Sequence, residues 1–135
     1  MAAKKPLIEA HISDISVGVI QRHIKSFRKF LGHKKSGIYV LRKGDEVYYV
    51  GLAGSLRFRL PHHIKDHHKG KWDRFELYAV LKGKVKYLND LEALLIRVAK
   101  PKGNKAEPKF VRHHNRTKEF RKALVKETAG LFLGK

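Results

Sequence analysis

Two tyrosines and an arginine recur at ten-residue intervals in the middle of the chain, and their side chains can bind a phosphate. Tyr39 lies ten residues before Tyr49, and Arg59 follows ten residues later. A phenol donates or accepts a hydrogen bond, and a guanidinium stays charged and matches the geometry of phosphate oxygens. If folding brings the three side chains together, two hydroxyls and one cation surround a single phosphate.

A hairpin and the helix after it must position these residues. Two β-rich runs, 38–42 and 46–50, flank a Lys-Gly-Asp connection of the length and composition that closes a hairpin. This pattern predicts an antiparallel pair with the two phenols on neighbouring strands. Ser55 is a plausible N-cap for a following helix, from which Arg59 would project.

The rest of the chain predicts a small α+β domain with a mainly antiparallel three-stranded sheet flanked by helices. The third strand is expected over 75–81, and residues 7–12 can add a fourth, N-terminal strand. Apolar spacing predicts helices from Ser13 or Asp14 to Leu31, over 88–99 with Asn89 or Asp90 as cap, and from about Thr117. Within 88–99, the packed face is expected to be Leu88, Leu91, Leu94, Leu95 and Val98.

The charge of the chain points to a polyanionic partner. Thirty-one Lys and Arg against 12 Asp and Glu give a formal charge of +19. The basic residues run through the whole length, which favours nucleic acid over a membrane surface. No stretch approaches the ~18 apolar residues of a membrane span, and the start lacks the apolar run of a signal peptide. We therefore expect a cytoplasmic protein, nucleoid-associated if bacterial. The lack of cysteine excludes disulfides and thiolate metal sites.

Aromatic and histidine side chains follow the Arg59 helix. Residues 62–68 contain four histidines and Asp66, and a metal site there would have His63 and His67 on one helical face. We favour the simpler interpretation, in which these histidines are extra hydrogen-bond donors beside a phosphate site. Trp72 is expected to anchor packing at the entry of the third strand, with stacking on an unpaired base as the alternative.

The runs Gly-Ile-Tyr at 37–39 and Tyr-Val-Gly at 49–51 resemble the signature of the GIY-YIG nucleases. That family carries an arginine on the first helix after the hairpin, a glutamate on a later helix and an asparagine after it. Arg59, Glu92 and Asn104 match these positions, and the twelve-residue step from Glu92 to Asn104 is similar to that of the bacterial excision-repair incision nuclease. His63 is similar to a histidine of the homing and restriction members.

The match covers about residues 36–104 and implies a GIY-YIG-like core there. Residues 1–35 would then be an N-terminal extension with a basic amphipathic helix, and 105–135 a basic C-terminal extension with a helix. The resemblance implies a metal-dependent endonuclease that hydrolyses DNA and leaves 5′-phosphate and 3′-hydroxyl ends. The catalytic residues that it implies are Tyr39, Tyr49, Arg59, His63, Glu92 and Asn104.

The resemblance also implies a role for each residue. Glu92 would hold Mg²⁺ or Mn²⁺, and Arg59 would neutralise charge on the phosphate. Tyr39 or Tyr49 would orient or deprotonate the water, with His63 relaying the proton or acting directly. Asn104 would fix local geometry. The basic residues expected to contact nucleic acid are Arg57, Lys65, Lys69 and Lys102.

One position departs from the family pattern and keeps alternatives open. Some members have a lysine just after the second motif, which is thought to lower the tyrosine's pKa, whereas this chain has Leu52. Tyr39, Tyr49 and His63 therefore all stay candidates for activating water. The alternative function is a nucleic-acid-binding module of the same fold that does not cut, and a structural or ribosome-associated basic protein is a third. DNA is the expected partner, RNA is a variant, and a homodimer is left open.

Overall fold

The computed structural model describes residues 5–32, 35–105, 110 and 115–132. One antiparallel sheet has the strand order β1-β4-β2-β3. Its strands are β1 (Ile8–Ser16), β2 (Gly37–Lys43), β3 (Glu46–Ala53) and β4 (Arg74–Val80). The predicted α+β class, the antiparallel sheet and the added N-terminal strand are confirmed.

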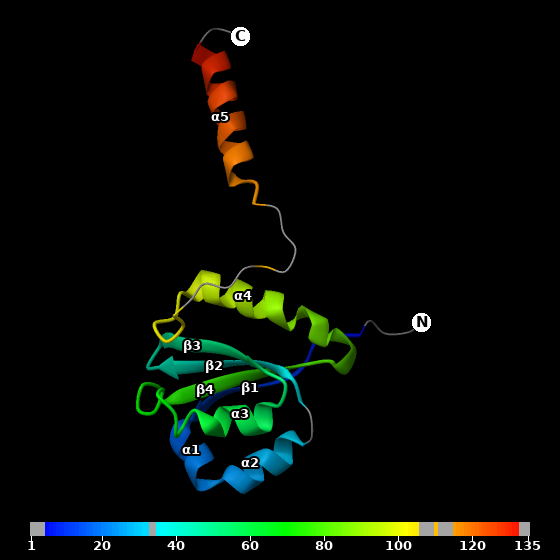
Figure 1. Ribbon diagram of the computed structural model, residues 1–135, viewed down its shortest axis with the longest axis vertical. Coiled ribbons are helices and arrows are strands. Elements are labelled where there is room, and N and C mark those ends of the chain that lie inside the picture. The colour runs from blue at the N-terminus through cyan, green and yellow to red at the C-terminus, as the bar shows by residue number, and fades with distance from the viewer. Residues whose placement is uncertain (1–4, 33–34, 106–109, 111–114, 133–135) are drawn as a thin grey trace.

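Helices lie on both faces of the sheet (Figure 1). One face is covered by α1 (Val17–Arg22), α2 (Ile24–Leu31) and α3 (Leu56–His62). The other is covered by α4 (Leu88–Ala99), which follows the 3-10 helix η1 (Lys82–Tyr87). The last helix, α5 (Thr117–Phe132), extends away from the sheet. In the described part of the chain, no helix has the length and hydropathy to cross a membrane.

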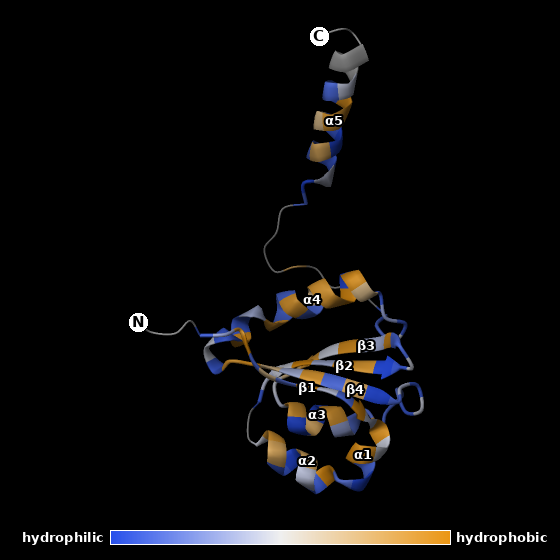
Figure 2. Ribbon diagram, turned by 180° about the vertical axis from the view of Figure 1, so that it is seen from behind, coloured by the Kyte–Doolittle hydropathy of each residue, from blue (hydrophilic) through white to orange (hydrophobic). Residues whose placement is uncertain are grey.

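The sheet separates two apolar cores because successive side chains of a strand point to opposite faces. Tyr39 and Leu41 of β2 point into the core beneath α1–α3, whereas Ile38 and Val40 point into the core beneath α4. Hydrophobic segments, drawn in orange, occur in the helices on both sides of the sheet (Figure 2). The phenol of Tyr39 therefore belongs to the α3 side of the sheet.

The predicted hairpin of β2 and β3 is confirmed, and it contains one irregularity. Leu41 pairs with Tyr49, but the next residue of β2, Arg42, pairs with Val47, so Tyr48 is an extra residue in β3. A bulge of this kind bends a strand and redirects a side chain. Tyr48 and Tyr49 consequently both pack against the core beneath α1–α3.

The predicted N-terminal helix was wrong in its start and its continuity. The chain stays in β1 through Ser16, and Asp14, expected as a cap, has a positive φ of 57° at a register shift against β4. Its carboxylate instead accepts a hydrogen bond from Arg74 at 2.8 Å. The helical stretch then breaks at His23, whose φ of −130° and ψ of 38° are not helical.

Helix α4 has the predicted bounds, but its packing differs from the prediction. The residue at its N-cap is Tyr87, and neither Asn89 nor Asp90 occupies that position. Its buried side chains are Leu88, Ala93 and Ile96, with Leu91 partly buried, whereas Leu94, Leu95 and Val98 are exposed. The small Ala93 is fully buried, and the adjacent Glu92 is partly buried at the border of the packed face.

Candidate active site

The hydroxyl of Tyr39 is the centre of the candidate site. The side chain is fully buried, its Oη lies 2.6 Å from Nε2 of His63, and it is also hydrogen-bonded to Arg59. The ring of Tyr49 lies 6.0 Å from the ring of Tyr39. The structure therefore brings together the two phenols, the guanidinium and the histidine that the sequence singled out.

Gly51 makes room for this arrangement. It pairs directly with Tyr39 across the hairpin, and a Cβ built on it would lie 2.4 Å from both Oη and Cζ of Tyr39. Any larger residue would displace the phenol. At the start of β2, a Cβ on Gly37 would lie 2.0 Å from the carbonyl oxygen of Tyr78, so the first tripeptide also needs its glycine. Both glycines permit close approach of a neighbouring group.

Asp66 holds the second nitrogen of His63. Its Oδ2 lies 2.6 Å from His63 Nδ1, and its Oδ1 accepts the backbone N–H of His68 at 2.9 Å. A carboxylate at Nδ1 requires the proton on that nitrogen, which leaves Nε2 as an acceptor for the Tyr39 hydroxyl. Trp72 supports the same residue by donating its Nε1–H to the His63 carbonyl at 3.3 Å. Asp66, His63 and Tyr39 thus form one hydrogen-bonded series.

The pKa values of the series follow from burial and hydrogen bonding. Burial lowers the pKa of His63, although the hydrogen bond to Asp66 opposes this change. Burial by itself would raise the pKa of the Asp66 carboxyl, but hydrogen bonds from His68 and His63 outweigh this effect, and the pKa is lowered. Burial raises the pKa of Tyr39 despite its bond to Arg59. At neutral pH the phenol and imidazole are therefore neutral and Asp66 is ionised, so the acceptor of the series is Nε2 of His63.

A pocket opens beside this series where β3 ends and α3 begins. Its volume is about 490 Å³, and its lining residues are Leu52, Ala53, Gly54, Ser55, Phe58, Arg59 and His62. The predicted N-cap, Ser55, has the expected position, although its side chain makes no capping bond. Leu56 and Leu60 anchor the other side of α3 in the core, which directs Arg59 toward the pocket. Pro61 lies in the last turn, and the helix ends one residue later.

Glu92 approaches the same end of β3 from the opposite face of the sheet. Its carboxylate accepts the backbone N–H of Leu52, a residue that also lines the pocket beside Arg59. Burial raises the pKa of Glu92, and no charged residue in the described part of the chain offsets this effect. A desolvated carboxylate without a cationic neighbour is suited to hold a hard divalent cation, which would favour its ionised form.

Asn104 fixes the outer edge of β3. Its Oδ1 accepts the Val50 N–H at 2.9 Å, and its Nδ2 donates to the Val50 carbonyl at 2.8 Å. The neighbouring Gly103 donates its N–H to the Tyr48 carbonyl at 2.7 Å. Since β3 is the last strand of the sheet, these bonds replace those of a missing fifth strand. They hold the strand that carries Tyr49 and Gly51.

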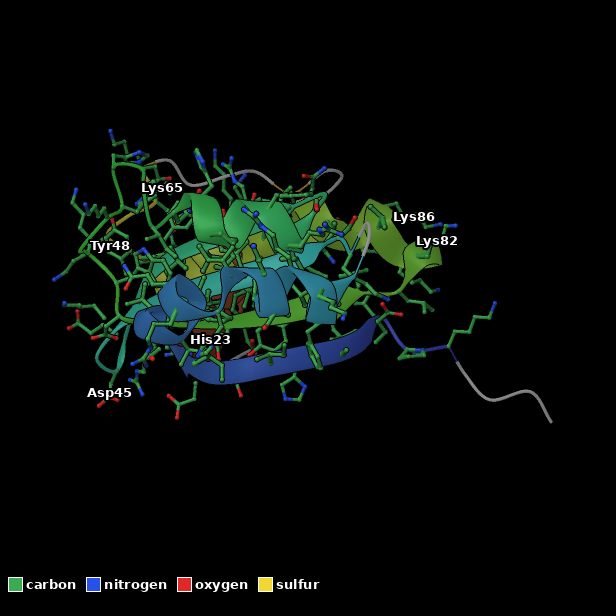
Figure 3. The ribbon with its side chains drawn as sticks, turned by 90° about the horizontal axis from the view of Figure 1, so that it is seen from below. His23, Asp45, Tyr48, Lys65, Lys82 and Lys86 are labelled. Atoms are coloured by element: carbon green, nitrogen blue, oxygen red, sulfur yellow. The ribbon has the colours of Figure 1, made fainter. Side chains whose placement is uncertain are left out.

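The four basic residues expected to contact nucleic acid lie in different settings. Lys65 and Lys69 are exposed in the turns after α3, and Lys102 is exposed with its Nζ 3.8 Å from Glu46. Arg57 is half-buried against the ring of Phe58. Lys65 lies at the same end of the molecule as Tyr48, opposite to Lys82 and Lys86 (Figure 3).

Three contributors were not identified as site residues from the sequence: Tyr48, Asp66 and His68. The Tyr48 hydroxyl lies 2.8 Å from Nδ1 of His68, and Tyr48 reaches it through the β3 bulge, which has no sequence signal. Asp66 and His68 belong to the histidine-rich segment, so their types were a signal but their partners were not. Burial also lowers the pKa of His68 and raises that of Tyr48.

The ligand atoms of His63, Asp66 and His68 lie within 4.8 Å of one another, a spacing that a metal ion could use. The atoms are already engaged, since both nitrogens of His63 and Nδ1 of His68 have hydrogen-bond partners. The segment forms turns and not a helix, so the i, i+4 argument for His67 does not apply. A metal bound to either nitrogen of His63 would displace a hydrogen bond to Asp66 or to Tyr39, and the hydrogen-bonded series is the better account of the cluster.

Comparison with known proteins identifies similar solved structures. Two crystal structures of the GIY-YIG N-terminal endonuclease domain of UvrC from Thermotoga maritima, both tyrosine-to-phenylalanine mutants bound to the catalytic divalent cation, match with a TM-score of 0.48. The identities are 24% and 23%, and each match covers 61% of this chain and 98% of the other. No protein-family model and no curated protein sequence matches the chain.

Proposed function

We propose that this chain is a metal-dependent endonuclease of the GIY-YIG type that hydrolyses DNA phosphodiester bonds. The observation that carries the proposal is the network on Tyr39, in which one buried phenol connects the Asp66–His63 pair to Arg59 beside a pocket. Such a network can accept a proton at one end and offer a cation to a phosphate at the other. The motif spacing of the sequence supports the same assignment.

In this proposal His63 is the base and Tyr39 is the relay. As the water oxygen forms its bond to phosphorus, a water O–H bond breaks and the proton passes to the Tyr39 oxygen. The hydroxyl proton of Tyr39 passes at the same time to His63 Nε2, 2.6 Å away. Asp66 then stabilises the imidazolium. A phenol that burial keeps neutral can relay a proton in this way, although it is a poor base by itself.

The remaining groups act on the phosphate. Arg59 keeps its charge and donates N–H groups to the non-bridging oxygens while negative charge builds there. Tyr49 supplies a second hydroxyl to orient the water. Mg²⁺ or Mn²⁺, held by Glu92 with water and substrate oxygens completing its shell, would stabilise the departing oxygen. Breaking the bond from phosphorus to the 3′-oxygen leaves 5′-phosphate and 3′-hydroxyl ends.

The charge of the chain supports a nucleic acid as substrate. A net charge of +19 favours a polyanion through release of counterions, and we assign backbone contacts to Arg57, Lys65, Lys69 and Lys102. The second candidate is a module of the same fold that binds DNA or RNA without cutting. Leu52 favours it, because a hydrophobic residue takes the place of the lysine that some nucleases of this type have.

A cleavage assay separates the two functions. Plasmid, branched and single-stranded DNA are incubated with Mg²⁺ or Mn²⁺ and either the wild type, Arg59→Ala or Glu92→Ala. We expect metal-dependent cleavage that both variants lose. Equal cleavage by both variants would show a contaminating nuclease. Tight, salt-dependent binding without cleavage on any substrate would favour the binding module.

A further inference from the structure

Phe58 is an exposed aromatic residue in the wall of the candidate active-site pocket. It lines the pocket together with Arg59 and His62, and 53% of its surface is accessible. The core-facing residues of α3, Leu56 and Leu60, are fully buried, so Phe58 lies on a different side of the helix. Exposure of an aromatic ring at this place is not explained by packing of the fold.

Two guanidinium groups lie over the Phe58 ring. The Cζ of Arg57, the preceding residue, is 4.7 Å from the ring centroid, and the Cζ of Arg28, on α2, is 5.2 Å from it. Both distances are in the range of cation–π contacts. The Nε of Arg28 is buried and has no hydrogen-bond partner among the described residues, and its guanidinium contacts the Phe58 ring. The ring and the two guanidinium groups form a positively charged cluster, here called the Phe58 platform.

A partly exposed aromatic ring beside guanidinium groups suits an unpaired nucleobase. Bases of single strands stack on aromatic rings or on guanidinium planes, and the backbone is attracted by the adjacent positive charge. A base inside a duplex is stacked on its neighbours and its face is covered. Trp72, the aromatic residue that the sequence suggested for stacking, is 3% exposed and cannot serve.

We propose that the Phe58 platform binds an unpaired base of the nucleotide next to the scissile phosphate. This inference rests on the proposed nuclease function and specifies its substrate: single-stranded or locally unpaired DNA, such as a flap, bulge or junction. The pocket volume of about 490 Å³ lies within the roughly 300–1,000 Å³ of sites that hold small ligands, so it can admit one nucleotide. Arg59 would hold the phosphate while the platform holds its base.

Stacking can be measured without cleavage. The full chain is mixed, in EDTA, with oligonucleotides that carry 2-aminopurine in a single strand, in a one-base bulge or in a perfect duplex. Fluorescence quenching reports stacking, and anisotropy of a distant label reports affinity. The variants are Phe58→Ala and Phe58→Trp, and the control is Phe30→Ala, which removes a ring that is 77% exposed on α2 and does not line the pocket.

We expect the wild type to quench 2-aminopurine in the single strand and the bulge but not in the duplex. Phe58→Ala should abolish quenching and weaken binding of unpaired substrates roughly 5- to 150-fold, the range for loss of one stacked base. Binding of the duplex should change little. Phe58→Trp should keep quenching, and Phe30→Ala should behave as the wild type. Because the ring is half exposed, we expect Phe58→Ala to keep the wild-type melting temperature.

Unchanged quenching in Phe58→Ala would overturn the inference, and so would an equal loss of affinity for duplex and unpaired DNA. Quenching that is lost equally in Phe30→Ala would also overturn it. The nuclease proposal is tested separately, since the binding assay contains no metal. If bases stack on Phe58 but the metal-loaded protein cleaves no DNA, only the nuclease proposal is contradicted. If cleavage depends neither on Phe58 nor on whether the DNA is paired, only this inference is contradicted.

Discussion

Replacing Asp66 with asparagine tests whether His63 is the base. The carboxylate fixes the Nδ1 proton of His63 from 2.6 Å. Asparagine can turn its NH₂ group toward Nδ1, and this favours the other tautomer, with the proton on Nε2. That tautomer cannot accept the hydroxyl proton of Tyr39. Since a positioned base contributes about 10²- to 10⁴-fold, we expect Asp66→Asn to lower kcat/KM by about that factor, or ~3–5 kcal/mol.

The pH dependence gives this variant a second readout. Burial lowers the pKa of His63 below its ordinary 6.5, and Asp66 opposes the decrease. The base must be neutral, so activity is lost as pH falls through this pKa, and the acid limb of the wild type should lie below 6.5. Without the carboxylate the pKa falls further. The acid limb of Asp66→Asn should therefore move to lower pH while its plateau drops.

The assay is cleavage of a fluorescent oligonucleotide under kcat/KM conditions from about pH 5 to 8, the range in which a histidine titrates. Asp73→Asn is the matched control, because Asp73 also accepts a backbone N–H, from Gly44, but does not contact His63. Melting curves show whether each variant is folded. An Asp66→Asn enzyme with a wild-type plateau, or with an acid limb that moves to higher pH, would refute the assignment of His63 as base.

Four other changes have defined outcomes. Tyr39→Phe keeps the ring but removes the hydroxyl that relays the proton, so the rate of cleavage should fall about 10²- to 10⁴-fold. In urea unfolding, the free energy of unfolding should fall by about 1–3 kcal/mol, because His63 and Arg59 lose their hydrogen-bond partner. Cleavage at the wild-type rate would exclude the relay. Gly51→Ala places a Cβ 2.4 Å from the phenol of Tyr39 and should lower the free energy of unfolding by about 1–3 kcal/mol in the same experiment. Gly83→Ala, whose Cβ would have nothing within 4 Å, should lower it much less. Equal decreases would contradict the steric argument. Asn104→Ala removes two bonds to β3 and should speed amide exchange in that strand, and unchanged exchange would show that the edge is held otherwise. We expect calorimetry to detect Mn²⁺ binding by the wild type and none by Glu92→Gln, and binding retained by the variant would place the metal ligand elsewhere.

The sequence predicted the elements with short-range signals. Two β-rich runs and a Gly-containing connection identified β2 and β3, and the motif spacing singled out the phenols and Arg59. The start of α1 was wrong because pairing of β1 with β4 extends the strand through Ser16, a long-range effect. The packed face of α4 was wrong at Leu94, Leu95 and Val98, because the spacing of large apolar residues did not show that Ala93 and Ile96 would be the buried ones.

The candidate site was predicted less completely than the fold. The roles of Tyr39, Tyr49, Arg59, His63, Glu92 and Asn104 stay predictions, although the structure brings the first four together. Asp66 was not predicted as the partner of His63, although it lies only three residues later, because the turn that brings the two side chains together was not expected. Phe58 was missed because a lone aromatic residue on a short helix is typical of a core, and only the structure shows its exposure.

The central claim is that Glu92, Arg59 and the two phenols surround one site that holds a divalent cation and a phosphate. Anomalous diffraction from a Mn²⁺-soaked crystal tests this claim most directly. We predict a single strong peak about 2.1 Å from a carboxylate oxygen of Glu92, at the pocket that Arg59 lines, with the bond between His63 and Tyr39 intact. A peak coordinated by His63, Asp66 and His68, with no peak beside Glu92, would contradict the account.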